Sequence, residues 1–261
     1  MTPLSIVILI VVFIVVILLI QYIFSDPYTL QSLQNGKTAS TVQASSLATN
    51  GSSVPSSNFA YSIWFYVNDW NYRYGETKVI FGRMGAASAS GSGSISGLNG
   101  LDPCPAVVLG AVENNISVSL GCYPGINQQP TTPGGSTVVK TCSVSNIPIQ
   151  KWVNLTVSVY GRSMDIYIDG KLVRTCLLPG VANVNNNANV YITPNGGFEG
   201  WTSKFQYYPN SISPQEAWNI YTGGYSNWFS SYKLQISLVY ILFGLYRDEK
   251  QIRICLLLLH N

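Results

Sequence analysis

The chain opens with a long apolar stretch that only Ser5, Gln21 and Tyr22 interrupt. Residues 4–24 read LSIVILIVVFIVVILLIQYIF and contain no charged side chain. A helix of this length, rising about 1.5 Å per residue, spans the ~30 Å hydrocarbon core of a bilayer. The run exceeds the roughly 7–15 apolar residues of a cleaved signal peptide, and no basic segment precedes it. We therefore expect a retained single-pass membrane anchor at 4–24, with the lipid bilayer as its partner.

Polar residues dominate the next segment. Residues 25–58 are rich in Ser, Thr, Asn, Gln and Gly and hold few large apolar side chains. Such a composition buries too little apolar surface to offset the entropy lost on ordering the chain. It predicts a flexible linker over 25–58, with the folded domain beginning at Phe59.

From Phe59 onwards, apolar and polar positions alternate with a period of two. This pattern is clear in FAYSIWFYV and in KWVNLTVSVY, and it is typical of strands that pack one face on a core. Asp169 and Gly170 separate two further alternating runs, which predicts a tight hairpin. A second hairpin is predicted to turn at Glu113, Asn114 and Asn115.

One helix interrupts this strand pattern. Ser213, Pro214 and Glu216 form a capping-box sequence, and two glycines from Gly223 onwards end the helix. We expect Trp218 to lie on its buried face. Many short strands and one short helix predict an all-β, antiparallel jelly-roll β-sandwich with a short C-terminal helix, behind a single transmembrane helix.

The composition excludes several classes of function. The net charge is +3, and only 10% of residues are charged, against about 25% in ordinary domains. Nucleic acid is therefore not an expected partner. The single histidine, His260, lies next to the C-terminus, so the body can hold neither a His-dependent nucleophile nor a His-ligated zinc site.

Three segments of the chain resemble a known family. In order, they are FAYSIWFYVNDW, KWVNLTVSVYGRSMDIYIDGKLV and GGFEGWTSKFQYYPNSISPQEAWNIYTGG. They resemble the LamG-like jelly-roll domains of the concanavalin A-like lectin/glucanase superfamily, which implies one such domain over 59–238. The pairing of this domain with a bare N-terminal membrane helix resembles proteins encoded by large DNA viruses of algae. That second resemblance implies a component of a virion.

The resemblance also raises an enzymatic alternative, a glycoside hydrolase of the concanavalin A-like fold. Glucanases of the superfamily carry a Glu-x-Asp-x-x-Glu strand, and this chain has no such strand. The nearest same-face pair is Asp165 and Asp169, and it ends in a hairpin turn. Glycoside hydrolysis requires two carboxyl groups about 5–9.5 Å apart across a cleft. We therefore expect no enzyme and no catalytic residues.

Calcium is the cofactor that the resemblance brings into question, because some LamG-like domains bind it through carboxylate, amide and carbonyl oxygens. Asp69, Asn71, Asp102 and Glu199 are the residues that would contribute. The sequence shows no run of alternating acidic ligands. We expect no cofactor or metal, with calcium as the alternative.

Four cysteines lie in the expected domain. Cys104 and Cys122 are equidistant from residue 113, the turn of their hairpin, so we expect them to form a disulfide. Cys142 and Cys176 are then the second bridge, one of three connectivities. The alternative is four buried free thiols in a reducing compartment. Bonded cysteines would place the domain on the extracellular, lumenal or virion-exterior side.

An aromatic segment follows the first strand and is the candidate binding surface. It comprises Asp69, Trp70, Tyr72, Arg73 and Tyr74. Aromatic faces beside short polar groups suit sugar rings or a protein partner. The alternative is that these aromatic side chains only cover the edge of the sandwich.

The C-terminal tail, 239–261, contains two apolar pieces split by RDEKQIR, and each is too short to cross a bilayer. Either it packs on the domain or the membrane surface, or it is an atypical end, and we expect low order there. Together these features predict a membrane-anchored, non-enzymatic recognition or structural module. Its partner is a glycan or a protein, and the sequence does not decide the orientation of the anchor.

Overall fold

The computed structural model describes residues 28–47, 57–84, 98 and 100–226, together with the isolated positions Phe13 and Val15. A compact unit covers Pro27–Tyr225. No helix among these described residues is long and apolar enough to cross a membrane. Except for Phe13 and Val15, the expected anchor at 4–24 lies outside them, and so does the whole tail at 239–261.

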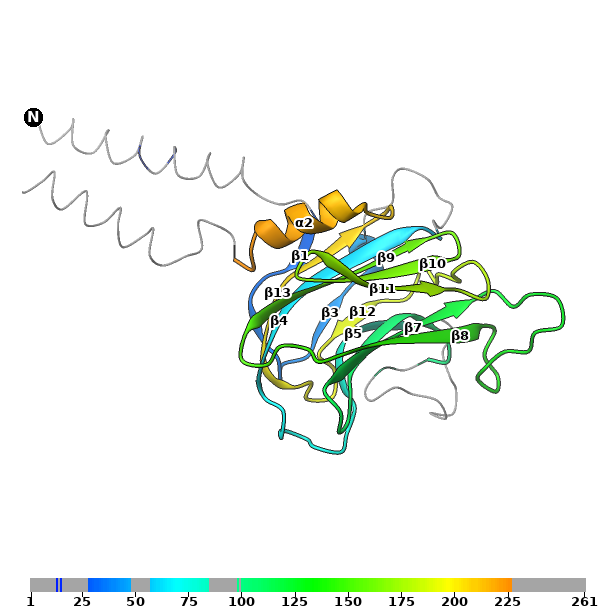
Figure 1. Cartoon of the computed structure of the whole chain (residues 1–261), viewed down its shortest axis with the longest axis horizontal. Helices are drawn as coiled ribbons and strands as arrows, with labels where there is room; N and C mark the ends of the chain where they lie inside the picture. Colours follow the sequence, from blue (N-terminus) through cyan, green and yellow to red (C-terminus); the bar gives the residue numbers. More distant parts are fainter. Residues whose placement is uncertain are drawn as a thin grey trace, which may run out of the picture. The chain divides into compact units, whose positions relative to one another are not determined.

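Two antiparallel sheets form the domain (Figure 1). In the first sheet the strand order is β1-β13-β4-β9-β10-β11, with β2 also pairing with β13, and in the second it is β3-β12-β5-β6-β7-β8. The strands of the first sheet are β1 (Thr29–Gln31), β2 (Gln34–Asn35), β4 (Phe59–Asp69), β9 (Trp152–Tyr160), β10 (Ser163–Ile168), β11 (Lys171–Leu177) and β13 (Glu199–Tyr208). Those of the second are β3 (Ser40–Val42), β5 (Lys78–Met84), β6 (Pro103–Leu109), β7 (Asn115–Cys122), β8 (Val138–Ser145) and β12 (Val190–Ile192). The predicted all-β sandwich and both predicted hairpins are confirmed.

The core lies between the two sheets and follows the predicted alternation. On β4, Tyr61, Ile63 and Phe65 point inward and are at most 1% exposed. Each large apolar side chain buried in this way contributes roughly 1.5–3 kcal/mol of transfer free energy. Tyr61 also packs against Phe81 of β5 and Phe205 of β13, with ring centroids 5.6 and 5.8 Å away. Aromatic residues of both sheets therefore meet at the centre of the sandwich.

Residues 28–47 differ from the expected flexible linker. β1 pairs with β13, β2 also pairs with β13, and β3 pairs with β12. Val42 and Leu47 are buried and belong to the core. The prediction of a linker over 25–58 is therefore wrong for 29–46. An edge strand needs few apolar side chains when a neighbouring strand satisfies its backbone hydrogen bonds. The polar composition of 29–46 therefore did not indicate the strands that it forms.

The short helix, α2 (Pro214–Thr222), lies over the outer face of the first sheet (Figure 1). The capping box is confirmed, because Ser213 Oγ accepts from Glu216 N and Ser213 N donates to Glu216 Oε2. The expected burial of Trp218 is wrong, since its side chain is 42% exposed. Tyr221 makes the sheet contact instead, stacking on Trp64 with centroids 5.6 Å apart.

Gly170 explains how closely the helix approaches the sheet. It adopts a positive φ of 72° in the hairpin between β10 and β11. A Cβ atom there would lie 2.9 Å from Tyr221 Cβ and 3.1 Å from Trp218 Cα. The missing side chain lets α2 pack directly on the hairpin, and the Cβ atom would also lie 3.1 Å from Cε3 of the Trp218 ring.

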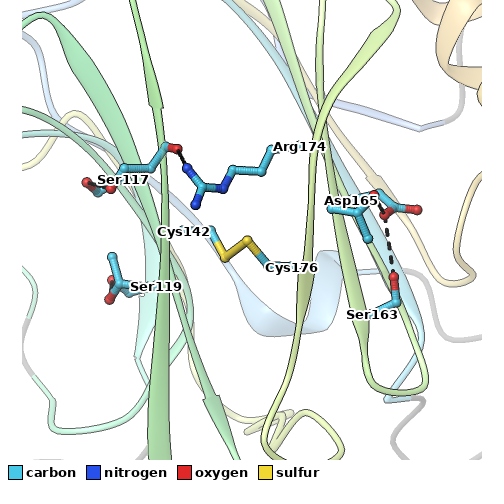
Figure 2. Close-up of a disulfide and its surroundings, with 10 residues drawn as sticks. Ser117, Ser119, Cys142, Ser163, Asp165, Arg174 and Cys176 are labelled. Carbon is cyan, nitrogen blue, oxygen red and sulfur yellow. Dashed lines mark hydrogen bonds between the residues drawn. A yellow bond between two sulfur atoms is a disulfide. The ribbon is translucent and has the colours of Figure 1, made fainter.

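A disulfide joins the edges of the two sheets. Cys142 of β8 and Cys176 of β11 are bonded, and each strand is the last in its sheet (Figure 2). Arg174 crosses the same gap and donates from Nη1 to the carbonyl oxygen of Ser143 at 2.7 Å. The second of the two expected bridges is confirmed.

The first expected bridge is wrong, because Cys104 and Cys122 are both free and buried. On β6 and β7, Leu109 lies opposite Ile116 and Ala106 opposite Ser119. Extending this register places Cys104 opposite the residue before Cys122, so the two side chains leave opposite faces of the sheet. Burial raises the pKa of both thiols, which keeps them in the unreactive protonated form.

Candidate functional site

A row of aromatic side chains crosses the outer face of the first sheet. Trp201 of β13 lies opposite Tyr66 of β4, and Tyr66 lies opposite Trp152 of β9. Residues directly opposite each other in an antiparallel pair project from the same face of the sheet. The three rings are therefore neighbours on adjacent strands, and the Tyr66 and Trp152 ring centroids are 5.8 Å apart.

These rings line an open groove of about 400 Å³, which we call the aromatic groove. Its lining residues are Leu33, Tyr66, Asn68, Trp152 and Trp201. Trp201 is 44% exposed and Leu33 is 60% exposed, whereas Tyr66 and Trp152 are half-buried. The groove thus combines a broad apolar floor with an exposed carboxamide, that of Asn68.

Tyr225 fixes one end of the aromatic row. Its ring stacks on Trp152 with centroids 4.5 Å apart and planes 8° from parallel. The carbonyl oxygen of Tyr225 accepts a 2.6 Å hydrogen bond from Ser203 Oγ of β13. The chain that follows α2 is thereby tied to the sheet, and Trp152 is held in place by a second ring.

Buried polar side chains support the strands that carry the row. Ser62 Oγ accepts hydrogen bonds from Asn154 Nδ2 and from Thr156 Oγ1, both at 3.1 Å. Because these bonds join β4 to β9 on the outer face, they help to hold Tyr66 and Trp152 in register. Satisfied buried polar groups of this kind favour one arrangement over shifted ones.

Asp165 and Asp169, the same-face pair considered for a glycoside hydrolase, both accept hydrogen bonds within the domain. Asp165 accepts from Thr175 Oγ1 at 2.6 Å, and Asp169 accepts from the backbone N–H of Asn154 at 2.9 Å. Lys151 Nζ lies 3.4 Å from the second carboxylate oxygen of Asp169. Neither Asp165 nor Asp169 lines the aromatic groove, so this pair has a structural role in the hairpin.

The predicted binding segment, Asp69 to Tyr74, directs most of its polar groups back onto the domain. Trp70 Nε1 donates to the carbonyl oxygen of Val112 at 3.3 Å, and the Tyr72 hydroxyl donates to that of Gly196 at 3.1 Å. Arg73 donates to the carbonyl oxygen of Asn195 and forms a 2.6 Å ion pair with Glu76. Of the three aromatic side chains, only Tyr74 is exposed. A binding role for this segment stays a prediction.

Lys78 lies beneath the same segment and is almost fully buried. Its Nζ donates to the carbonyl oxygens of Trp70 at 3.3 Å and Tyr72 at 3.1 Å, and it lies 5.1 Å from the centroid of the Trp70 ring. Burial, and after it the positive charge of Arg73, lowers the pKa of Lys78. The lysine therefore acts as a clamp that organises the loop from within.

The proposed calcium ligands do not converge. Asp69 lies opposite Glu199 in the β4–β13 pair, but Asp69 accepts from Asn71 N and Glu199 is ion-paired with Lys37 at 2.6 Å. Asp102 begins the approach to β6 in the other sheet. Among the described residues, no group of three or more His, Cys, Asp or Glu residues is arranged to hold a metal.

Asp102 is instead the anchor of a long loop. Its buried carboxylate accepts from the backbone N–H and hydroxyl groups of both Ser136 and Thr137, with the hydroxyl oxygens 2.7 Å away. Burial alone would raise the pKa of Asp102, but the donors of Thr137 and Ser136 outweigh it and hold the pKa below its usual range. The charged form therefore secures the end of the loop that precedes β8.

The aromatic groove was missed by sequence reasoning, because its residues come from four separate parts of the chain. The one local signal was the polar face of the first strand, where Trp64 and Tyr66 alternate with the core positions. Large aromatics on a face expected to be solvated indicate a covered or binding surface. The structure shows both outcomes, since Trp64 is covered by Tyr221 and Tyr66 lines the groove.

Neither a family model nor a curated protein matches the sequence. Solved structures of botulinum neurotoxin binding domains are similar in fold. The binding domain of neurotoxin DC in complex with SialylT is 14% identical, with a TM-score of 0.50 over 74% of this chain and 41% of that one. The ligand-binding domain of serotype D in complex with N-acetylneuraminic acid is 14% identical, with a TM-score of 0.48 over 77% of this chain and 51% of that one.

This chain spans about half or less of the length of those two domains. Identity at this level shows the fold alone. The fold is a two-sheet antiparallel β-sandwich.

Proposed function

We propose that this protein is a non-enzymatic carbohydrate-binding module whose site is the aromatic groove. The observation that carries the proposal is the row of Trp201, Tyr66 and Trp152 on three adjacent strands, exposed in an open groove beside the carboxamide of Asn68. Sugar rings have apolar faces and a hydroxyl rim. They match a surface of flat aromatic rings with neutral hydrogen-bonding groups at its border.

The sequence resemblance to LamG-like domains supports the same proposal, since that superfamily includes lectins. The binding domain whose fold is shared at a TM-score of 0.50 was solved in complex with SialylT. That protein is longer and only 14% identical, so its complex serves here only to suggest saccharides as probes. On the resemblance to proteins of algal viruses, we also propose that this protein is a component of a virion.

Membrane attachment and orientation also belong to the proposal. The apolar run 4–24 supports a single-pass anchor in the bilayer. The disulfide between Cys142 and Cys176 supports a domain on the extracellular, lumenal or virion-exterior side, because such bonds form and persist in oxidising compartments. Protease treatment of sealed microsomes would test this: protection of the domain until detergent is added supports the lumenal side, which is topologically equivalent to the exterior, and cleavage without detergent contradicts it.

A glycoside hydrolase is less well supported. In the described part of the chain, the groove is lined by aliphatic, aromatic and amide side chains, without a carboxylate among them. Acid-and-nucleophile or acid-and-base hydrolysis needs a pair of carboxyl groups flanking the bond that breaks. A protein partner is the other candidate, since exposed Trp and Tyr side chains also favour protein interfaces.

A glycan array separates these functions. The full-length chain, kept in detergent micelles, is expected to bind a subset of glycans, and soluble sugars of the same type should compete with that binding. The Trp201→Ala variant should lose the signal, whereas Trp218→Ala should keep it, because Trp218 is similarly exposed but lies on α2 outside the groove. Absence of any sugar-competed signal would contradict the proposal and favour a protein partner.

A further inference from the structure

The geometry of the aromatic groove and the charges around it narrow the class of carbohydrate that the groove can bind. Resting on the proposed function, we infer that the groove takes a neutral, extended oligosaccharide of β-1,4-linked units, laid across the strands along the row of Trp201, Tyr66 and Trp152. The β-1,4 linkage is inferred from the direction of the aromatic row. The neutral character of the ligand is inferred from the charges around the groove.

The direction of the row sets the shape of the ligand. Trp201, Tyr66 and Trp152 occupy opposite positions on three neighbouring strands, so the row runs perpendicular to the strands, and the Tyr66 and Trp152 ring centroids are 5.8 Å apart. One pyranose unit of an extended chain advances by a similar distance. Because the sheet twists by only about 20–25° per strand, a nearly straight ribbon fits the row and a strongly coiled chain does not.

Linkage stereochemistry follows from this shape. Equatorial β-1,4 bonds give a straight ribbon whose rings present their flat apolar faces along its length. The axial–equatorial α-1,4 bonds curve the chain away from a flat surface after about two units. Leu33 lies at the β13 end of the groove and Tyr225 at the β9 end, stacked on Trp152. The row therefore accommodates about three consecutive rings, set by its three strand positions.

The charges around the groove indicate a neutral ligand. Among the residues that the structure describes, those that line the groove include no cation. The lysines on neighbouring segments have partners already: Lys37 Nζ is paired with Glu199, Lys151 Nζ with Asp169, and Lys204 Nζ donates to the carbonyl oxygen of Gly223. A carboxylate on the sugar would lose water against the aromatic floor without gaining an ion pair, which opposes binding.

The neutral groups at the border suit hydroxyls. Asn68 offers both a carbonyl acceptor and an amide donor, and Tyr66 carries a phenol hydroxyl. Such groups exchange hydrogen bonds with sugar hydroxyls without a charge to desolvate. The floor then provides the stacking area, and the border fixes the position of each ring.

The test is a calorimetric titration of the full-length chain in detergent micelles with sugars that differ in one property at a time. Glucose, cellobiose, cellotriose and cellotetraose vary the length, with affinity expected to rise about three- to tenfold per unit up to three and to level off afterwards. Maltotriose changes only the linkage and should bind at least about fivefold more weakly than cellotriose. The trimer of β-1,4-linked glucuronic acid replaces each hydroxymethyl group of cellotriose with a carboxylate and should also bind more weakly.

Each failure has a distinct reading. Equal or tighter binding of the glucuronic acid trimer or of maltotriose, lost in Trp201→Ala, would overturn the ligand class while the carbohydrate function stands. Binding of 3′-sialyllactose but not of cellotriose would do the same. If none of these sugars binds, and the glycan array is also silent, the proposed function itself fails. Near-ultraviolet circular dichroism of Trp201→Ala, matched to Trp218→Ala, confirms that the variant is folded.

Discussion

Trp152 and Tyr225 stack with their ring centroids 4.5 Å apart and their planes 8° from parallel. This contact joins β9 to the chain that follows α2, and Ser203 ties the same residue to β13 through its carbonyl oxygen. One wall of the aromatic groove is therefore held before any ligand arrives. Binding groups fixed in advance lose less conformational entropy when they bind.

The stack gives a first prediction. Tyr225→Ala should weaken cellotriose binding by about two- to tenfold, because Trp152 loses the ring that orients it. Tyr225→Phe keeps the ring and should bind normally. Titration calorimetry on both variants makes the comparison. If the alanine variant binds as tightly as the original chain, the stack has no part in preparing the groove.

The second prediction concerns the bridge between the sheet edges. The disulfide closes a separation of 34 residues between Cys142 and Cys176, and a loop of that length corresponds to roughly 3–4 kcal/mol in the chain-entropy account. Replacing both cysteines with serine should lower the free energy of unfolding by about that amount, measured by denaturant titration. A reductant should destabilise the original chain and leave the double variant unchanged. Equal effects of the reductant on both would contradict a bonded pair.

The third prediction concerns Asp102 and acid. Because the hydrogen bonds hold its folded-state pKa below the unfolded value of about 3.9, its stabilising contribution is complete above that pH and is lost as the pH falls through the folded pKa. Asp102→Asn should cost about 2–3 kcal/mol at neutral pH, since its amide would face N–H donors.

As the pH falls from 5 through the folded-state pKa of Asp102, the variant should lose less free energy of unfolding than the original chain, as measured by denaturant titration. A variant whose stability falls just as steeply with acid would show that Asp102 is not among the carboxylates responsible.

The fourth prediction separates structure from binding in the loop that the sequence had favoured. Lys78→Met removes three hydrogen bonds from Nζ to the carbonyl oxygens of Trp70, Tyr72 and Arg73. It should lower stability by about 1–3 kcal/mol and raise amide hydrogen exchange in 71–77. Lys151→Met, at an exposed ion pair, is the control and should cost less than about 1 kcal/mol. Unchanged amide hydrogen exchange in 71–77 would contradict this role of Lys78.

Much of the fold was open to prediction from the chain, because its signals are local. Strand alternation, the Asp169–Gly170 turn and the Ser213 capping box each depend on neighbours within a few residues. Register is different. The turn between β6 and β7 is centred half a residue before residue 113, as the pairing of Leu109 with Ile116 shows. That small offset sends Cys104 and Cys122 to opposite faces.

The candidate site depended on register even more strongly. Tyr66, Trp152 and Trp201 lie far apart in the chain, and only the pairing of three strands makes them neighbours. Trp70, Tyr72 and Tyr74 were predicted to form a binding surface because they lie close together in the sequence. In the structure, hydrogen bonds from Trp70 and Tyr72 close that cluster onto the domain. Clustering along the chain was therefore a poor guide to clustering on the surface.

The central claim is that the aromatic groove binds a saccharide, and one paired measurement tests it most directly. Cellotriose is titrated into the full-length chain, Trp201→Ala and Trp218→Ala under identical conditions. The two tryptophans are 44% and 42% exposed, so the substitutions remove similar surface from different places. We predict at least about tenfold weaker binding for Trp201→Ala and unchanged binding for Trp218→Ala. Equal affinities for all three proteins would contradict a binding site in the groove.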